Sequence, residues 1–159
     1  MRLRLSAAVL AVLAATGCGY RAGYVARQDI KYVSIPVFEN RTFYRDLEIG
    51  LTRAVVDEMD KTTPYSTSLS SSADAVLEGV ILAYSTPVLQ ENALDQPTES
   101  QVVITVEATL KSAGGKVLSK ARVRETETFN PAIGEDEGST RVRLFRRTAR
   151  QLIEKAFEE

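Results

Sequence analysis

The side chains that most often carry catalysis are scarce in this chain. Its 159 residues include no histidine and a single cysteine, Cys18. Without histidine, the usual general base near neutral pH and the commonest metal ligand are missing. One cysteine allows no internal disulfide and no cysteine-rich zinc site. The composition therefore argues against an enzyme or a metalloprotein, and we expect no bound cofactor.

The residues before Cys18 indicate which covalent modification its thiol can receive. A start with two arginines is followed by an uncharged apolar run, residues 5–15, which is too short to span a membrane as a helix. A basic start followed by such a run is typical of a secretory signal peptide. The small residues Thr16 and Gly17 then lead directly into Cys18. The pattern predicts export of the chain.

The segment around Cys18 resembles a bacterial lipobox, in which the signal is cut before cysteine and the cysteine is acylated. We therefore expect a signal peptide over 1–17, a lipidated tether over 18–29 and a single domain over 30–159. S-diacylglycerol and N-acyl lipid on Cys18 would anchor the chain to a membrane. The alternative is an ordinary signal peptide cut near Ala15, which stands where lipoboxes prefer leucine. Gly19, in place of the aspartate that favours inner-membrane retention, indicates the outer membrane, facing the periplasm.

Two carboxylates, Glu125 and Glu127, are the nearest approach to a catalytic pair. They are two residues apart on a predicted strand, and neighbouring carboxylates can perform acid–base work. They also alternate with Arg122 and Arg124, which favours a solvated strand face. An envelope hydrolase is a remaining alternative, and it would require a deep pocket around these two acids.

The positive charges form two local groups rather than a global field. Lys and Arg total 20 against 21 Asp and Glu, so the formal net charge is -1, and we expect no nucleic-acid partner. The first group surrounds a predicted hairpin: Lys111, Lys116, Lys120, Arg122 and Arg124. Its last three members alternate onto one strand face, which is either a contact surface or a solubility feature.

The second basic group lies on the predicted last helix. Arg143, Arg147 and Arg150 share one helix face at spacings of four and three. Arginine suits fork-like contacts with phosphate or carboxylate, so an anion site is one interpretation. We favour the other, a solvated helix face that offsets nearby glutamates.

The elements that must position these side chains follow from apolar periodicity and turn residues. We predict strands over 30–38, 73–84, 101–110 and 116–127, helices over 45–61 and from about 139, and a long loop over 86–100. The last two strands form a hairpin across Gly114 and Gly115, and the first two, joined through a helix, are parallel. The predicted fold class is α+β, with two helices packed on one face of a four-stranded mixed sheet as a two-layer sandwich.

Four segments carry a family resemblance: GCGYR at 17–21, VSIPVFENRT at 33–42, LEIGLTRA at 47–54 and ADAVLEG at 73–79. In this order they resemble the LptE family of lipopolysaccharide-assembly lipoproteins. The resemblance implies a non-enzymatic LptE-like domain that plugs the outer-membrane β-barrel LptD, assists its assembly and binds lipopolysaccharide during transport to the outer leaflet. It also implies that Cys18 is the lipid acceptor.

The ligand contacts are not carried over from the family, because no matching basic motif is present. From the residues themselves we expect the hairpin cations, Lys111, Lys116, Lys120, Arg122 and Arg124, to bind lipopolysaccharide phosphates or acidic sugars. The PVFENRT segment is also similar to exported lipoproteins of the TolB or CsgG kind. The alternative function is therefore a subunit of another envelope assembly or secretion complex.

Overall fold

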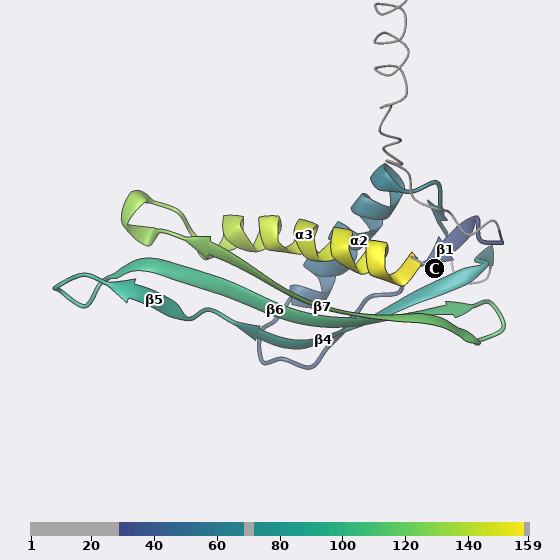
Figure 1. The fold of residues 1–159 in the computed structure, drawn as a ribbon, viewed down its shortest axis with the longest axis horizontal. Coiled ribbons are helices and arrows are strands. Elements are labelled where there is room, and N and C mark those ends of the chain that lie inside the picture. The colour runs from purple at the N-terminus through teal and green to yellow at the C-terminus, as the bar shows by residue number, and fades with distance from the viewer. Residues whose placement is uncertain (1–28, 69–71, 158–159) are drawn as a thin grey trace, which may run out of the picture.

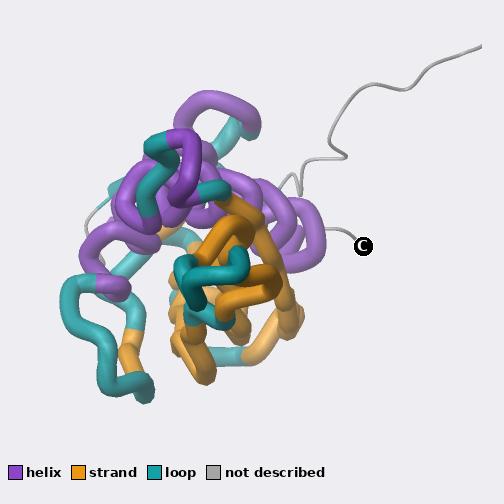
Figure 2. Tube along the Cα trace, turned by 90° about the vertical axis from the view of Figure 1, so that its left-hand side faces the viewer, coloured by secondary structure: helices purple, strands orange, loops and turns teal. Residues whose placement is uncertain are grey.

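The computed structural model describes residues 29–68 and 72–157. The predicted signal peptide, Cys18 and nearly all of the tether lie outside these residues. The described chain is an α+β fold with two α-helices and one mixed, curled sheet (Figures 1 and 2). Among the described residues, no helix combines the length and the apolar character needed to cross a membrane.

The elements follow one another in an order close to the predicted one. They are β1 (Tyr32–Ser34), β2 (Glu39–Asn40), α2 (Leu47–Thr62), β3 (Ser66–Thr67), β4 (Ala75–Ser85), β5 (Val88–Glu91), β6 (Pro97–Ser112), β7 (Val117–Phe129), the 3-10 helix η2 (Pro131–Ile133) and α3 (Glu137–Phe157). Both predicted helices are confirmed; β6 extends beyond both of its predicted ends, and β7 extends beyond its predicted C-terminal end.

The predicted number of strands, four, is wrong, because the described residues form a seven-stranded sheet. β2 and β3 have two residues each, too few for any periodic pattern in the sequence. β5 lies in the segment expected to be a loop. All four of its residues are exposed, so the sequence has no alternation of buried and exposed residues there that could predict a strand. Of the predicted strand over 30–38, only Tyr32–Ser34 is a strand, β1; it ends before Pro36, whose missing N–H cannot join a ladder, and β2 begins just after the predicted range.

The pairing of the long strands agrees with the prediction. β1 pairs with β4 in parallel, with Val33 opposite Ala75, and β6 pairs antiparallel with both β4 and β7. Gly115 in the β6–β7 turn has a φ of 81°, a conformation that glycine adopts without the cost other residues incur. The hairpin therefore places the β7 cations beside β6.

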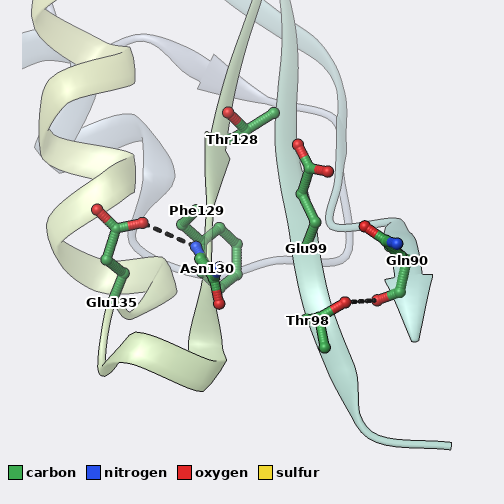
Figure 3. Close-up of a pocket in the computed structure, with 7 residues that line it drawn as sticks. All are labelled: Gln90, Thr98, Glu99, Thr128, Phe129, Asn130 and Glu135. Carbon is green, nitrogen blue, oxygen red and sulfur yellow. Dashed lines mark hydrogen bonds between the residues drawn. The ribbon is translucent and has the colours of Figure 1, made fainter. Parts of the chain in front are cut away.

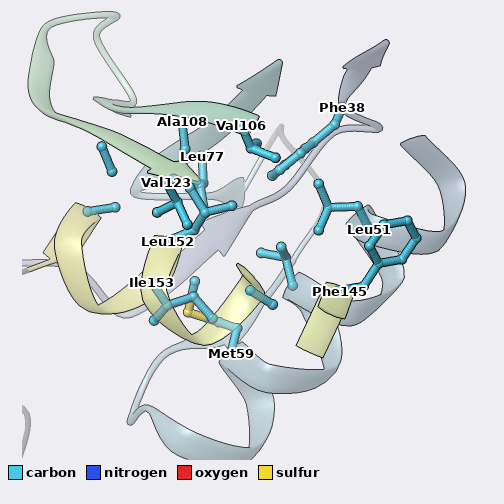
Figure 4. Packing of buried hydrophobic residues seen from close by; sticks show 14 of the residues in the cluster. Phe38, Leu51, Met59, Leu77, Val106, Ala108, Val123, Phe145, Leu152 and Ile153 are labelled. Atoms are coloured by element: carbon cyan, nitrogen blue, oxygen red, sulfur yellow. The ribbon is translucent and has the colours of Figure 1, made fainter. Parts of the chain in front are cut away.

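Alternation along β6 divides the sheet into two faces. Val102, Ile104, Val106, Ala108 and Leu110 are buried, whereas the residues between them are half-buried or exposed. We call the side with these buried residues the inner face and the opposite side the outer face. α3 packs against β6 and β7, and α2 packs against α3. Figure 4 shows Leu51, Met59, Phe145 and Leu152 of the helices meeting Val106 and Val123 of the sheet.

Two of the segments that carry the family resemblance interlock in the core. The Phe38 ring lies against Gly79 so closely that a Cβ built there would be 2.2 Å from its Cε2 atom. The Phe38 N–H donates to Thr52 Oγ1 at 3.0 Å, which ties the same segment to α2. Asp74 Oδ2 accepts the N–H groups of Lys31 and Tyr32 at 2.9 Å, and these bonds hold the pKa of Asp74 below its usual value. These residues therefore have structural roles.

Candidate functional site

The predicted cationic face of the hairpin is present on β7. Lys120, Arg122 and Arg124 are exposed on the outer face, whereas Ala121 and Val123 between them are buried. Pairing with β6 sets Lys120 opposite Thr109, Arg122 opposite Glu107 and Arg124 opposite Thr105. Lys111 of β6 pairs with Val76 of β4 on the same face. We call Lys111, Lys120, Arg122 and Arg124 the outer-face stripe.

The members of the outer-face stripe differ in what neutralises them. Lys111 Nζ lies 2.6 Å from Glu78 Oε2, and Arg122 Nη1 lies 3.2 Å from Glu107 Oε1. Lys120 and Arg124 have no carboxylate within 4.0 Å among the described residues. Four residues apart along one strand, their Cα atoms are about 13 Å from each other. The stripe therefore offers two unpaired cations on either side of an ion pair.

Lys116, the fifth predicted cation, lies apart from the stripe. It is in the turn between β6 and β7, where its N–H donates to Ser112 Oγ at 3.2 Å. The structure thus brings four of the five predicted residues onto one face of the sheet and leaves the fifth at the end of the hairpin.

The predicted solvated face of Glu125 and Glu127 is wrong for Glu125. Its side chain is only 8% exposed on the inner side of β7, and its Oε2 lies 3.3 Å from Arg147 Nη2. Glu127 Oε2 lies 2.5 Å from Arg147 Nη1, and Glu127 Oε1 lies 3.5 Å from Arg143 Nε. Arginines of α3 bind both carboxylates. Neither carboxylate is therefore free to act with the other as a general acid and base.

The third arginine of the predicted helix face is also neutralised within the chain. Arg150 Nε lies 2.8 Å from Glu58 Oε1 of α2, and the Glu58 side chain is 6% exposed. The hydrogen bond to this carboxylate raises the pKa of Arg150. The interpretation that this face offsets nearby glutamates is confirmed by these contacts.

A groove runs between α2 and α3 and was not predicted from the sequence. Its cavity of about 320 Å³ is lined by the half-buried Gly50 and Ala54, the buried Phe145 and the exposed Arg53 and Arg146, among others. The helices approach closely at Gly50, where a Cβ would lie 2.8 Å from the Phe145 ring. Periodicity identified the apolar stripe of each helix but gave no information about which residues would meet.

A second cavity, of about 220 Å³, lies between the β5–β6 hairpin and the end of β7 (Figure 3). Its seven lining residues include two carboxylates, Glu99 and Glu135, and no lysine or arginine. Glu135 Oε2 accepts the Asn130 N–H at 2.7 Å. The charge of this cavity disfavours an anionic ligand. In the described part of the chain, no group of three or more potential ligands could hold a metal ion.

Comparison with known proteins gives one family match. The family model described as LptE, lipopolysaccharide-assembly, matches residues 30–157. No curated protein matches the chain.

Solved structures share the fold at low sequence identity. An uncharacterized lipoprotein B from Nitrosomonas europaea has 14% identity and a TM-score of 0.56, with 85% of this chain and 90% of that chain covered. A PelC dodecamer from Paraburkholderia phytofirmans has 14% identity and a TM-score of 0.55, with coverage of 82% and 94%. The hypothetical protein CT253 from Chlamydia trachomatis has 12% identity and a TM-score of 0.51, with coverage of 77% and 98%.

Proposed function

The chain belongs to the LptE family of non-enzymatic lipopolysaccharide-assembly lipoproteins, and we propose that its outer-face stripe binds lipopolysaccharide during transport to the outer leaflet. Lipopolysaccharide is negatively charged, because its lipid A carries phosphates and its saccharide part contains acidic sugars. Lys and Arg form charge-assisted hydrogen bonds with such groups. The stripe would therefore compete with the cations that bridge neighbouring lipopolysaccharide molecules and loosen their packing.

The unpaired state of Lys120 and Arg124 is the observation that carries this proposal. Both side chains are exposed, and neither has a carboxylate partner among the described residues. A cation already neutralised within the chain must lose that contact before it can bind a phosphate. Two free cations on one strand face can instead bind two anionic groups of one ligand without any rearrangement.

The proposed setting is the lumen of an LptD-like outer-membrane β-barrel, with acyl chains on Cys18 as the anchor. Barrel lumens are lined by polar side chains, and the polar outer face of the sheet is compatible with such surroundings. The domain would act as a plug that also helps the barrel to assemble. The signal-peptide and lipobox patterns support this location in the outer membrane, facing the periplasm.

Binding to lipopolysaccharide micelles tests the assignment of the stripe. We expect Lys120→Glu/Arg124→Glu to weaken binding about tenfold or more, because two attractive contacts become repulsive. Lys31→Glu/Lys155→Glu changes the net charge equally at exposed positions outside the three long strands and should bind like the native chain. If both folded variants bind lipopolysaccharide equally well, the outer-face stripe is not the binding site.

The partner is tested separately by purifying the lipidated chain from membranes. We expect one copy to co-purify with one large β-barrel, and Cys18→Ala to lose membrane attachment. The alternative, a subunit of another envelope or secretion complex, predicts rings of this chain, which native mass spectrometry would detect. A ring without a barrel would reject the plug.

A further inference from the structure

Exposed apolar side chains occur on both helices that form the groove and in the loop before α2. Ile49 of α2 is 52% exposed and Val142 of α3 is 58% exposed, and Phe43 in the loop before α2 is fully exposed. Gly50, Ala54, Val142 and Phe145 form the apolar part of the groove lining. Apolar patches bordered by polar residues are typical of protein–protein interfaces.

The loop before α2 is fixed beside the start of α3. The Tyr44 ring packs edge-on against Tyr84 at a centroid distance of 4.8 Å. The Tyr84 hydroxyl donates to Glu137 Oε1 at 2.8 Å, in the first turn of α3. Desolvation and this carboxylate raise the pKa of Tyr84 above its ordinary value, which favours the protonated hydroxyl that donates to Glu137. The apolar surface is thus presented by a loop that is already ordered.

The charges on the groove differ between its two sides. Arg53 and, on α3, Arg141 and Arg146 have no carboxylate within 4.0 Å among the described residues, although three other arginines of α3 do. On α2, Lys61 lies 4.0 Å from Asp57. Arg141 also acts on the Tyr84 hydroxyl and lowers its pKa, so the exposed cation left without a partner on the α3 side of the described groove is Arg146, whereas the α2 side is of mixed charge.

We propose that this groove binds an acidic amphipathic helix of a protein partner. Helices commonly dock in this way, with apolar residues at spacings of three and four filling a groove. A cavity of about 320 Å³ has room for only a few such side chains. The helix's carboxylates would face Arg53 and Arg146. Asp46 and Asp57 on the α2 side would repel a polyanionic lipid headgroup, but they can pair with the mixed charges of a protein.

The proposal concerns a second surface, separate from the outer-face stripe, and it does not depend on lipopolysaccharide binding. The full chain carrying the photoreactive residue benzoylphenylalanine at Val142 is irradiated in cells, and the adduct is identified by mass spectrometry. We expect one dominant adduct whose cross-linked peptide is acidic and has apolar residues at helical spacing. The same probe at Val117, in the exposed first position of β7, is the matched control and should not give this adduct.

Charge reversal then tests the role of the arginines. Arg53→Glu/Arg146→Glu should lower the yield of the Val142 adduct about tenfold, because both substituted residues would repel an acidic helix. Lys31→Glu/Lys155→Glu should leave the yield unchanged, and thermal unfolding confirms that each variant is folded. The proposal is overturned by no adduct, a lipid adduct, a basic peptide, equal yields at both probe positions, or a yield insensitive to Arg53→Glu/Arg146→Glu.

Discussion

The arginines of α3 and the cations of β7 have the same chemistry but different surroundings. Arg143, Arg147 and Arg150 are bound to carboxylates of the chain itself, and two of those carboxylates are buried. Lys120 and Arg124 face outward without a partner among the described residues. We therefore treat a cationic cluster as a candidate ligand site only when its charges are not already paired within the fold.

Replacing Arg147 should give the largest effect on stability. Arg147→Met leaves Glu125 buried without its cation and removes the nearer of the two arginines that bind Glu127, so we expect the free energy of unfolding to fall by about 3 kcal/mol. Urea unfolding measures the loss, and Glu125→Gln/Arg147→Met should recover most of it. A loss below about 0.5 kcal/mol would mean that the α3 pairs are no more structural than surface ion pairs.

Replacing Arg150 should give a smaller effect of the same kind. Arg150→Met removes the single cation at Glu58, whereas Arg147 serves two carboxylates. We expect the urea midpoint to shift about half as far as in Arg147→Met. The paired change Glu58→Gln/Arg150→Met should reverse part of the shift, and a larger shift in the pair than in the single variant would contradict this account.

Ionic strength should separate the two clusters without any substitution. Exposed charges are screened by salt, whereas buried pairs are screened much less. When the salt concentration is raised, we expect lipopolysaccharide binding to weaken about tenfold, whereas the urea midpoint should change little. Binding that does not respond to salt would indicate that apolar contacts, rather than Lys120 and Arg124, supply the affinity.

Releasing a stripe cation from its internal partner should give the smallest effect. Glu107→Gln removes the acceptor 3.2 Å from Arg122, so all three cations of β7 become available. We expect binding to lipopolysaccharide to tighten about threefold, with stability unchanged within about 0.5 kcal/mol, because the pair is exposed. Asp57→Asn, which releases Lys61 from an exposed ion pair on α2, is the control, and equal effects of both would remove the special role of Arg122.

Local patterns predicted the parts of the fold that repeat. Alternation identified the buried side of β6 and the exposed side of β7, and the spacing of apolar residues identified α2 and α3. The short strands β2 and β3 were not predictable, because two residues carry no period. β5 is formed by pairing with β6 and has no buried face of its own.

The site was predicted only as far as residue type and face. That Lys120, Arg122 and Arg124 share one side of a strand follows from a period of two. The register between β7 and β6 sets Arg122 opposite Glu107. This register decides that Arg122 is neutralised, whereas Lys120 and Arg124 are not. Arg150 and Glu58 are 92 residues apart, so their pairing depends on how α2 and α3 cross. The groove depends on the same crossing, which no local pattern specifies.

The contact between Phe38 and Gly79 has a consequence for how such sequences can diverge. With a Cβ at position 79 only 2.2 Å from the ring, the glycine tolerates no larger residue while the phenylalanine stays. A larger residue at position 79 is admissible only after, or together with, a smaller side chain at position 38. Two residues 41 positions apart are therefore coupled in one direction: homologues with a larger residue at position 79 should also have a smaller one at position 38, whereas a smaller residue at 38 can coexist with Gly79.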